Sequence, residues 1–241
     1  MINIVVPIAG KSEFFDESGA SFPKPFAEIC GKTMIEHFIE NFKGIENKRF
    51  IFILKEEYIK RFHLDEAIRV LLECKCEFIS VKKETQGMAC SVMLATEFID
   101  NDEPLIISNA DQIIEKNLSL LLDYFKDFDA GVVVFESIHP RFAYVKLNAQ
   151  DQVLEAFEKQ PRSKNAVAGF YYFAKGSYFM RASEKMIKKD VNFEGRYFIA
   201  PCLNELILNN AKIKALKLEK NEFHTFYSPT KITEYERIKN A

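Results

Sequence analysis

The sequence predicts an α/β fold, with a mostly parallel central sheet flanked by helices and an antiparallel lobe in the second half. As far as about residue 130, short apolar runs alternate with helical patterns, which is typical of strands buried on both faces of a parallel sheet. Beyond residue 130, strand-like runs follow one another without helices between them. No Pro/Gly-rich linker separates these two parts of the sequence. We therefore expect one domain over residues 1–241, with halves at 1–130 and 131–241.

The first half is expected to be a doubly wound layer. Strands are predicted at Ile4–Ile8, Arg49–Leu54, Cys76–Val81 and Pro104–Ser108, and helices at Thr33–Phe42, Glu56–Glu73 and Gln86–Ile99. Right-handed crossovers would place these helices on both faces of the sheet. Ligands of such sheets bind outside the carboxyl ends of the strands. The polar loops after Ile8 and after Ser108 both fall at that edge, so we expect the site there.

The second half is expected to add antiparallel strands and then return to helices. Strands are predicted at 131–137, 142–148, 152–159, 167–173 and 212–218, and helices at 177–189, 198–208 and 230–239. Residues 148–151 read Asn-Ala-Gln-Asp, a sequence suited to the turn of a hairpin. This half would form a lobe over the binding edge of the first half.

Composition narrows the functional classes. The chain has 241 residues, of which 48% are hydrophobic, enough for a substantial core. A net charge of −2 without a basic block argues against nucleic-acid binding. No apolar run approaches the roughly 20 residues that a membrane span needs, and no secretory signal is visible after Met1. We expect a cytoplasmic protein without a membrane partner.

The cysteine pattern agrees with a reducing compartment. The five cysteines are scattered, and the chain has no Cys-x-x-Cys motif or paired histidine that would indicate a zinc site. Cys30, Cys90 and Cys202 lie in apolar neighbourhoods. Buried free thiols are therefore expected.

The loop after the first strand has features of a phosphate cradle. Ala9 and Gly10 are small enough for the backbone to approach an anion closely. Lys24 stands between two prolines, which restrict the backbone and lower the entropy cost of aiming its charge at a phosphate. Neither G-x-x-x-x-G-K-[ST] nor G-x-G-x-x-G is present. From these residues alone, an ordinary surface loop is the favoured interpretation.

Three further constellations lie at predicted element ends. In "PLIISNADQII" Asp111 follows a buried strand, where a carboxylate could hold Mg²⁺ against nucleotide phosphates or cap a turn. Gln86 and Gly87 begin a predicted helix, where a base or sugar could approach closely. Glu158 and Lys159 end a strand, where they could bind sugar hydroxyls and a phosphate or form an exposed ion pair.

The order of these motifs resembles the sugar-phosphate nucleotidyltransferase family, the sugar-nucleotide pyrophosphorylases, over nearly the whole chain. The stretches "FPKPF…GKTMIEHFIEN", "NADQ" and "HPRFAYVKL" are similar to a bacterial branch found with capsule and lipopolysaccharide biosynthesis genes. The resemblance implies a Rossmann-like GT-A fold and Mg²⁺ as cofactor. It also implies a nucleoside triphosphate and a phosphorylated sugar or polyol as substrates.

The resemblance also assigns residues. Lys24 and Asp111 would be catalytic, with Asp111 as the metal ligand. Expected nucleotide-binding residues are Ile8, Ala9, Gly10, Lys11, Gln86, Gly87 and Asn109. Expected acceptor-binding residues are Glu158, Lys159 and Gly169, joined on position in the sequence by Arg141 in the loop after "FESIHP" and by Glu194, Arg196 and Tyr197 in "NFEGRYF".

Two positions depart from the family pattern. An ungapped alignment of the first loop places Phe14 where the family has a triphosphate-binding arginine, although Lys11 could supply a cation. In "EFHTFYSPT" Thr225 falls where the family has a second metal-binding aspartate, and Glu222 or His224 could help instead. These differences leave open whether activity is retained, redirected or lost.

We therefore predict a nucleotidyltransferase that joins a nucleoside monophosphate, from a nucleoside triphosphate, to a sugar or polyol phosphate for surface polysaccharide precursors. One alternative is a GT-A glycosyltransferase, although its usual Asp-x-Asp is here Asn109-Ala110-Asp111. Another is a degenerate member that binds nucleotide without turnover. The base, the acceptor and the number of subunits, including assembly as a homo-oligomer, are not fixed by the sequence.

Overall fold

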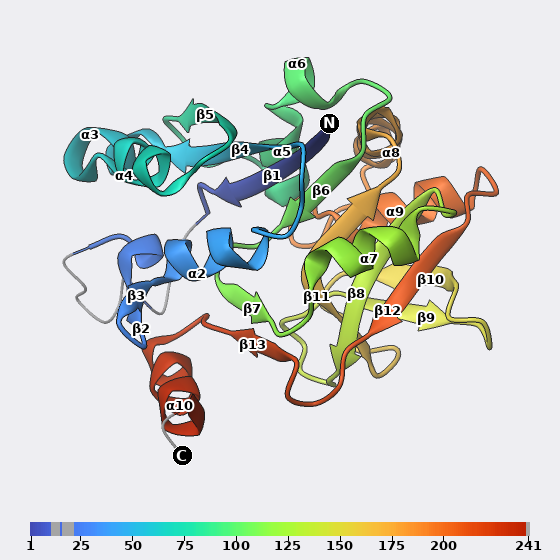
Figure 1. The fold of residues 1–241 in the computed structure, drawn as a ribbon. Helices are drawn as coiled ribbons and strands as arrows, with labels where there is room; N and C mark the ends of the chain where they lie inside the picture. Colours follow the sequence, from blue (N-terminus) through green and yellow to red (C-terminus); the bar gives the residue numbers. More distant parts are fainter. Residues whose placement is uncertain (11–14, 16–21, 240–241) are drawn as a thin grey trace.

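A large mixed sheet runs through the computed structural model, which describes residues 1–10, 15 and 22–239 (Figure 1). Its strands are β1 Ile2–Ile8, β4 Lys48–Lys55, β5 Lys75–Val81, β6 Leu105–Ser108, β8 Ala130–Glu136, β9 Tyr144–Leu147, β10 Val153–Phe157, β11 Asn165–Phe173 and β12 Ile213–Lys217. The order is β10-β9-β11-β6-β1-β4-β5, and β8 pairs with both β11 and β12. β1, β4, β5 and β6 run parallel, whereas β11 is antiparallel to β6 and β8. The predicted α/β fold is confirmed.

Helices cover both faces of this sheet (Figure 1). They are α2 Met34–Asn41, α3 Glu56–Phe62, α4 Leu64–Leu71, α5 Met88–Met93, α6 Thr96–Ile99, α7 Leu118–Phe125, α8 Gly176–Lys188 and α9 Ala200–Ile207, with the 3-10 turn η1 at Lys24–Phe26. The last helix, α10 Pro229–Lys239, instead packs in a small separate core with Ile29, Met34 and Ile113. Ile4 belongs to the core beneath α2 and α7, and its neighbour Val5 to the core beneath α5, α8 and α9. This alternation explains why the strands are apolar throughout, since both faces of the sheet are buried.

Two predicted helices are interrupted. The helix expected over Glu56–Glu73 is divided into α3 and α4 at His63, whose φ of 49° is left-handed and ends α3. The helix expected over Gln86–Ile99 begins only at Met88 and is divided into α5 and α6. The apolar periodicity continues through both breaks, which is why the sequence pattern did not reveal them.

The antiparallel half follows the predicted strands closely. β9 and β10 form the expected hairpin, in which the Asp151 N–H donates to the Asn148 carbonyl over 3.1 Å and Asp151 takes a φ of 56°. Through β11, this half continues the same sheet as the parallel half. α8 and α9 pack on the face that also carries α5. The antiparallel half is therefore built on the first half's sheet.

Two short strand pairs were not predicted. β2 (Glu28–Ile29) pairs with β3 (Lys32–Thr33), and β7 (Gln112–Ile114) pairs with β13 (Phe223–Thr225), both antiparallel. The second pair aligns Thr225 with Gln112, and the Phe226 N–H donates to the Asp111 carbonyl over 2.8 Å. It thereby brings a segment near the end of the chain beside Asp111.

The structure also shows the lengths of the helices and the exposure of the cysteines. Within residues 1–10, 15 and 22–239, no helix combines the length and the apolar character needed to span a bilayer. All five cysteines are free thiols, but only Cys202 is fully buried, and Cys30 is exposed rather than buried as expected. The exposure of Cys30 follows from its place in the tight turn between β2 and β3, where it takes a φ of 48°.

Candidate active site

The carboxyl ends of β1 and β6 meet at a cavity of about 320 Å³, which we call the nucleotide cavity after the ligand that the sequence predicts here. The loop after β1 contributes Ala9 and Gly10, η1 contributes Lys24, and the loop after β6 contributes Asp111. The remaining lining residues are Pro7, Glu84, Thr85, Gly87, Met88, Ser91, Arg141, Arg196, Phe198 and Tyr227. Because parallel strands end at one edge, residues 87 positions apart in sequence become neighbours here.

Lys24 and Asp111 form an ion pair inside this cavity. The Lys24 Nζ donates to Asp111 Oδ2 over 2.5 Å, and the Phe15 ring centre lies 5.2 Å from the same ammonium. Burial alone would raise the pKa of the Asp111 carboxyl. The charge of Lys24 and the hydrogen bond it donates outweigh burial and hold that pKa below its usual value, with Arg141 acting in the same direction. Asp111 is therefore poised as a carboxylate.

Other expected nucleotide-binding residues are placed differently. Ile8 lies at the end of β1 and Gln86 is exposed, and neither lines the nucleotide cavity. Gly87 does line it, with a φ of 114°. A Cβ on Gly87 would lie 2.3 Å from the Tyr197 carbonyl oxygen, so a close backbone contact already requires glycine. Lys11 and Phe14 lie outside the described residues.

A second cavity of about 180 Å³ adjoins the first, and we call it the acceptor cavity after the ligand that the sequence predicts for its residues. It is lined by Met88, Asn109, Gln112, Arg141, Phe142, Ala143, Glu158, Lys159, Val167, Gly169, Tyr171, Phe198, Ile199, Phe223 and Thr225. Asn109, expected at the nucleotide, lies here. Gly169 has a φ of 57°, and a Cβ would lie 2.5 Å from the Asn109 Nδ2, so glycine makes room for this amide. The predicted acceptor residues Glu158, Lys159, Gly169 and Arg141 are thus brought together.

Glu158 is the one carboxyl among the described residues that line this cavity. Burial raises the pKa of Glu158 to about 7, and the nearby Lys159 charge offsets only part of that effect. The Lys159 Nζ lies 5.1 Å from the Phe198 ring centre and 5.4 Å from that of Phe193. Near neutral pH, Glu158 can therefore accept or donate a hydrogen bond, depending on its protonation.

Of the residues expected in "NFEGRYF", only Arg196 lines a cavity. Glu194 sits in an exposed turn with a φ of 51°. The Tyr197 hydroxyl donates to the Asp190 Oδ1 over 2.7 Å at the surface, while its backbone packs on Gly87. Phe198, which lines both cavities, was missed. No sequence signal marked it, because its role depends on where the Tyr197 backbone docks.

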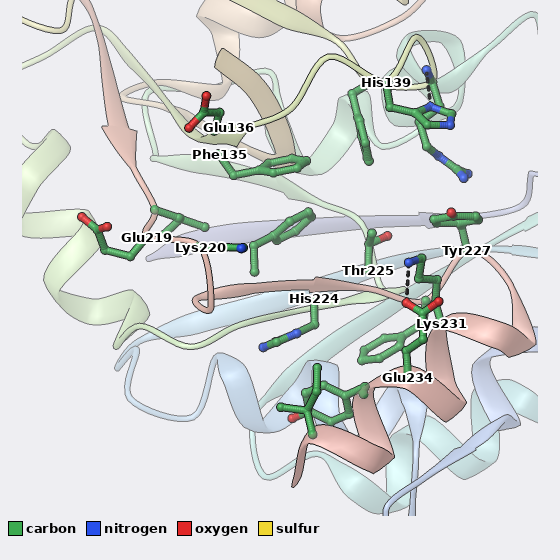
Figure 2. A pocket seen from close by; sticks show the side chains of 17 residues that line it. Phe135, Glu136, His139, Glu219, Lys220, His224, Thr225, Tyr227, Lys231 and Glu234 are labelled. Carbon is green, nitrogen blue, oxygen red and sulfur yellow. Dashed lines mark hydrogen bonds and ion pairs between the residues drawn. The ribbon is translucent and has the colours of Figure 1, made fainter. Parts of the chain in front are cut away.

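A third cavity of about 740 Å³ lies beside the first two (Figure 2). In Figure 2, Thr225 lies at the centre of this cavity and Tyr227 at one end. Lys220 and Glu219 lie at the other end, and His139 lies above. An ion pair joins Lys231 to Glu234 on α10. Arg141 and Tyr227 line both this cavity and the nucleotide cavity. It is larger than either, but it lacks the Lys24–Asp111 pair.

Few of the described side chains are arranged to bind a metal ion. Among the described residues, no three His, Cys, Asp or Glu side chains gather as a metal site. Glu222 instead pairs with Lys116 over 2.8 Å, and the His224 Nε2 lies 3.7 Å from a Glu115 oxygen. Mg²⁺ often takes only one or two protein carboxylates, with phosphate oxygens and water as its other ligands. Asp111 alone satisfies that minimum, so the residues present fit this ion.

Comparison with known proteins decides the family. The family model described as "Nucleotidyl transferase" matches residues 19–212. The chain belongs to the nucleotidyl transferase family. The match includes Lys24 and Asp111 and most residues that line the two cavities. It begins after Pro7, Ala9 and Gly10 and ends before Phe223, Thr225 and Tyr227.

One curated protein and two solved structures are distant relatives of this chain. It is 27% identical over 222 residues to the bifunctional protein GlmU of Methanocaldococcus jannaschii, covering 90% of this chain and 49% of the relative. The chain thus spans about half the length of that curated relative. A solved nucleoside-diphosphate-sugar pyrophosphorylase from Vibrio cholerae RC9 superposes with a TM-score of 0.86 at 24% identity, over 98% of this chain and 100% of that one. The inositol-1-phosphate CTP transferase from T. maritima gives 0.77 at 15%, over 99% and 95%. At these identities the structures establish the fold.

Proposed function

We propose that this protein transfers a nucleoside monophosphate from a nucleoside triphosphate to a sugar phosphate or polyol phosphate, with release of pyrophosphate. Membership of the nucleotidyl transferase family supports the reaction class. The two acceptor types follow the range of the neighbours, whose names specify a nucleoside-diphosphate sugar in one case and inositol 1-phosphate in the other.

The observation that carries the proposal is the adjoining pair of cavities. One contains the Lys24–Asp111 ion pair at the carboxyl ends of two parallel strands, and the other contains Glu158, Lys159 and Gly169. This arrangement fits two phosphorylated substrates that meet where the cavities join. We assign residues 1–130 to the nucleotide and residues 131–241 mainly to the acceptor, within one domain.

The chemistry requires positioning and charge neutralisation rather than a covalent enzyme intermediate. An oxygen of the acceptor phosphate attacks the α-phosphorus, and pyrophosphate leaves in line. Mg²⁺, held at Asp111, would neutralise charge on the phosphates. Lys24 would bind the α-phosphate and the leaving group, and Lys159 the acceptor phosphate. Glu158 and Asn109 would hydrogen-bond acceptor hydroxyls.

We infer that the product serves surface polysaccharide synthesis in the cytoplasm. The motifs "FPKPF", "NADQ" and "HPRFAYVKL" support this setting through their resemblance to the capsule and lipopolysaccharide branch. The five free thiols agree with a reducing compartment.

A substrate panel tests the proposal. The protein is incubated with each nucleoside triphosphate, Mg²⁺ and a series of sugar and polyol phosphates, and pyrophosphate release is measured. One productive pair is the expected result. Transfer from a nucleotide sugar without pyrophosphate would instead indicate a glycosyltransferase. Nucleotide binding by calorimetry without any turnover would indicate a degenerate member, for which the replacement of the family's second aspartate by Thr225 is the motivating observation.

A further inference from the structure

The nucleotide cavity and the acceptor cavity have three lining residues in common among those described: Met88, Arg141 and Phe198. If the proposed reaction is correct, the two reacting phosphates must touch where the cavities join. Of the three shared residues, only Arg141 carries a charge. The junction therefore presents one guanidinium to the region where the bond is made.

The same arginine lines the nucleotide cavity together with Lys24 and Asp111. Lys24 already donates a hydrogen bond to Asp111 over 2.5 Å, so part of its charge is balanced before substrate arrives. A planar guanidinium can hold two phosphate oxygens at once, whereas an ammonium acts as a point charge.

The loop that carries Arg141 is restrained. The Arg141 backbone N–H donates to the His139 Nδ1 over 3.3 Å, and the Tyr144 hydroxyl donates to the His139 carbonyl over 2.6 Å. The Arg141 guanidinium carbon lies 3.3 Å from the centre of the Tyr227 ring. Figure 2 shows Tyr227 at the same end of the third cavity as His139, on the chain between β13 and α10. The charge is thus held in place before the reaction begins.

We propose that Arg141 is a catalytic residue that binds the reacting phosphates at the junction of the two cavities, and that Tyr227 positions it. In this step, which rests on the proposed function, an acceptor phosphate oxygen forms a bond to the α-phosphorus. The bond from the α-phosphorus to the α,β-bridging oxygen breaks, and its electron pair leaves with pyrophosphate. Arg141 stabilises the charge that accumulates on the oxygens of the transferred phosphoryl group. Among the described residues, no other arginine or lysine lines both cavities. Arg141 therefore supplies the positive charge at their junction.

The test compares kcat and the two KM values of Arg141→Ala, Arg141→Lys and the wild type with the productive substrate pair. We expect Arg141→Ala to lower kcat about 100- to 1000-fold, the usual loss for one preorganised donor, while calorimetry gives nearly unchanged nucleotide affinity. Arg141→Lys should recover part of the rate. Guanidinium chloride, well below unfolding concentrations, should raise the rate of Arg141→Ala but not that of the wild type. A purely structural role would give no such rescue.

Controls separate the outcomes. Arg162 is a matched exposed arginine that lies 4.9 Å from the Phe157 ring and lines none of the three cavities, so Arg162→Ala should retain wild-type kcat. Tyr227→Phe should keep most of the rate, and Tyr227→Ala should lose about tenfold, since only the latter removes the ring. An active wild type with Arg141→Ala within threefold of it, or without guanidinium rescue, would overturn this assignment alone. A wild type that turns over no substrate pair would overturn the proposed function and this assignment together.

Discussion

The nucleotide cavity and the acceptor cavity differ in how their charges are balanced. In the nucleotide cavity, the Asp111 carboxylate is matched by Lys24 at 2.5 Å. In the acceptor cavity, burial raises the pKa of Glu158 to about 7, and Lys159 offsets only part of this. The first site is electrostatically satisfied before substrate binds. The second is not, so hydroxyl donors of an acceptor would relieve part of its desolvation cost.

The largest effect on turnover should come from removing either member of the Lys24–Asp111 ion pair. Lys24→Ala and Asp111→Ala should each lower kcat at least 100-fold because each removes a charge aimed at the phosphates. Asp111→Ala should also abolish the response of the residual rate to Mg²⁺. The double variant should lose less than the product of the single losses, since the two groups act as a unit. Steady-state kinetics with a Mg²⁺ titration measures all three.

A matched control for that experiment is Lys164→Ala. Lys164 pairs with Glu136 over 3.2 Å in a fully solvated setting and lines none of the three cavities. Its kcat should stay within twofold of the wild type. An Asp111→Ala enzyme that keeps Mg²⁺-dependent turnover would refute the proposed metal site.

The next effect should come from filling the acceptor cavity at Gly169. A methyl group there would collide with Asn109 and Gln112, so Gly169→Ala should raise the acceptor KM at least tenfold while nucleotide affinity remains unchanged. Gly195→Ala is the control, because Gly195 shares a left-handed φ, here 73°, but has open space around it. That variant should lose only about 1 kcal/mol of stability. Equal acceptor KM values for the two variants would contradict the cavity assignment.

A smaller effect should appear in the pH dependence of stability. The folded-state pKa of Glu158 is about 7, against an ordinary value of 4.5. Between these values the folded protein binds the extra proton, so this carboxyl lowers stability as pH rises through that window. Glu158→Gln should therefore unfold at a higher temperature than the wild type at pH 8, where its free energy of unfolding should be greater by up to about 3 kcal/mol. Near pH 4 the two proteins should be equally stable.

Thermal unfolding across this pH range provides the measurement. Glu155→Gln, on β10 three residues before Glu158 and paired with Lys146 at the surface, controls for the loss of one charge. In parallel, the acceptor KM of the wild type should change between pH 6 and 8 more steeply than that of Glu158→Gln. Identical unfolding curves for Glu158→Gln and wild type at pH 8 would show that this carboxyl is not destabilising.

The smallest effect is expected at Tyr197. Its hydroxyl bonds Asp190 at the surface rather than lining a cavity, so Tyr197→Phe should keep kcat and both KM values within twofold. Phe198→Ala, one residue further along, should raise KM for both substrates, because Phe198 lines both cavities. A tenfold rise in the acceptor KM of Tyr197→Phe would contradict this placement and show that the hydroxyl contacts the acceptor.

The strands and the main binding edge could be predicted because their signal is local. Runs such as "FIFIL" in β4 are apolar throughout, since both faces of the sheet are covered, and the strand ends within two residues of the prediction. The breaks at His63 and after Met93 could not be predicted, because the hydrophobic periodicity continues across them. The β7–β13 pair was missed because each strand has three residues and its partner is distant in sequence.

By itself, the sequence determined the α/β class, the position of the polar loops at the carboxyl ends of strands, and the candidates Lys24, Asp111 and Glu158. These follow from hydrophobic pattern and chain order, which are properties of neighbouring residues. Only the tertiary structure decided that Asn109 faces the acceptor cavity, that Tyr197 faces away, and that Arg141 stands at the junction. Those placements depend on which distant backbones dock together, above all β13 on β7 and Tyr197 on Gly87.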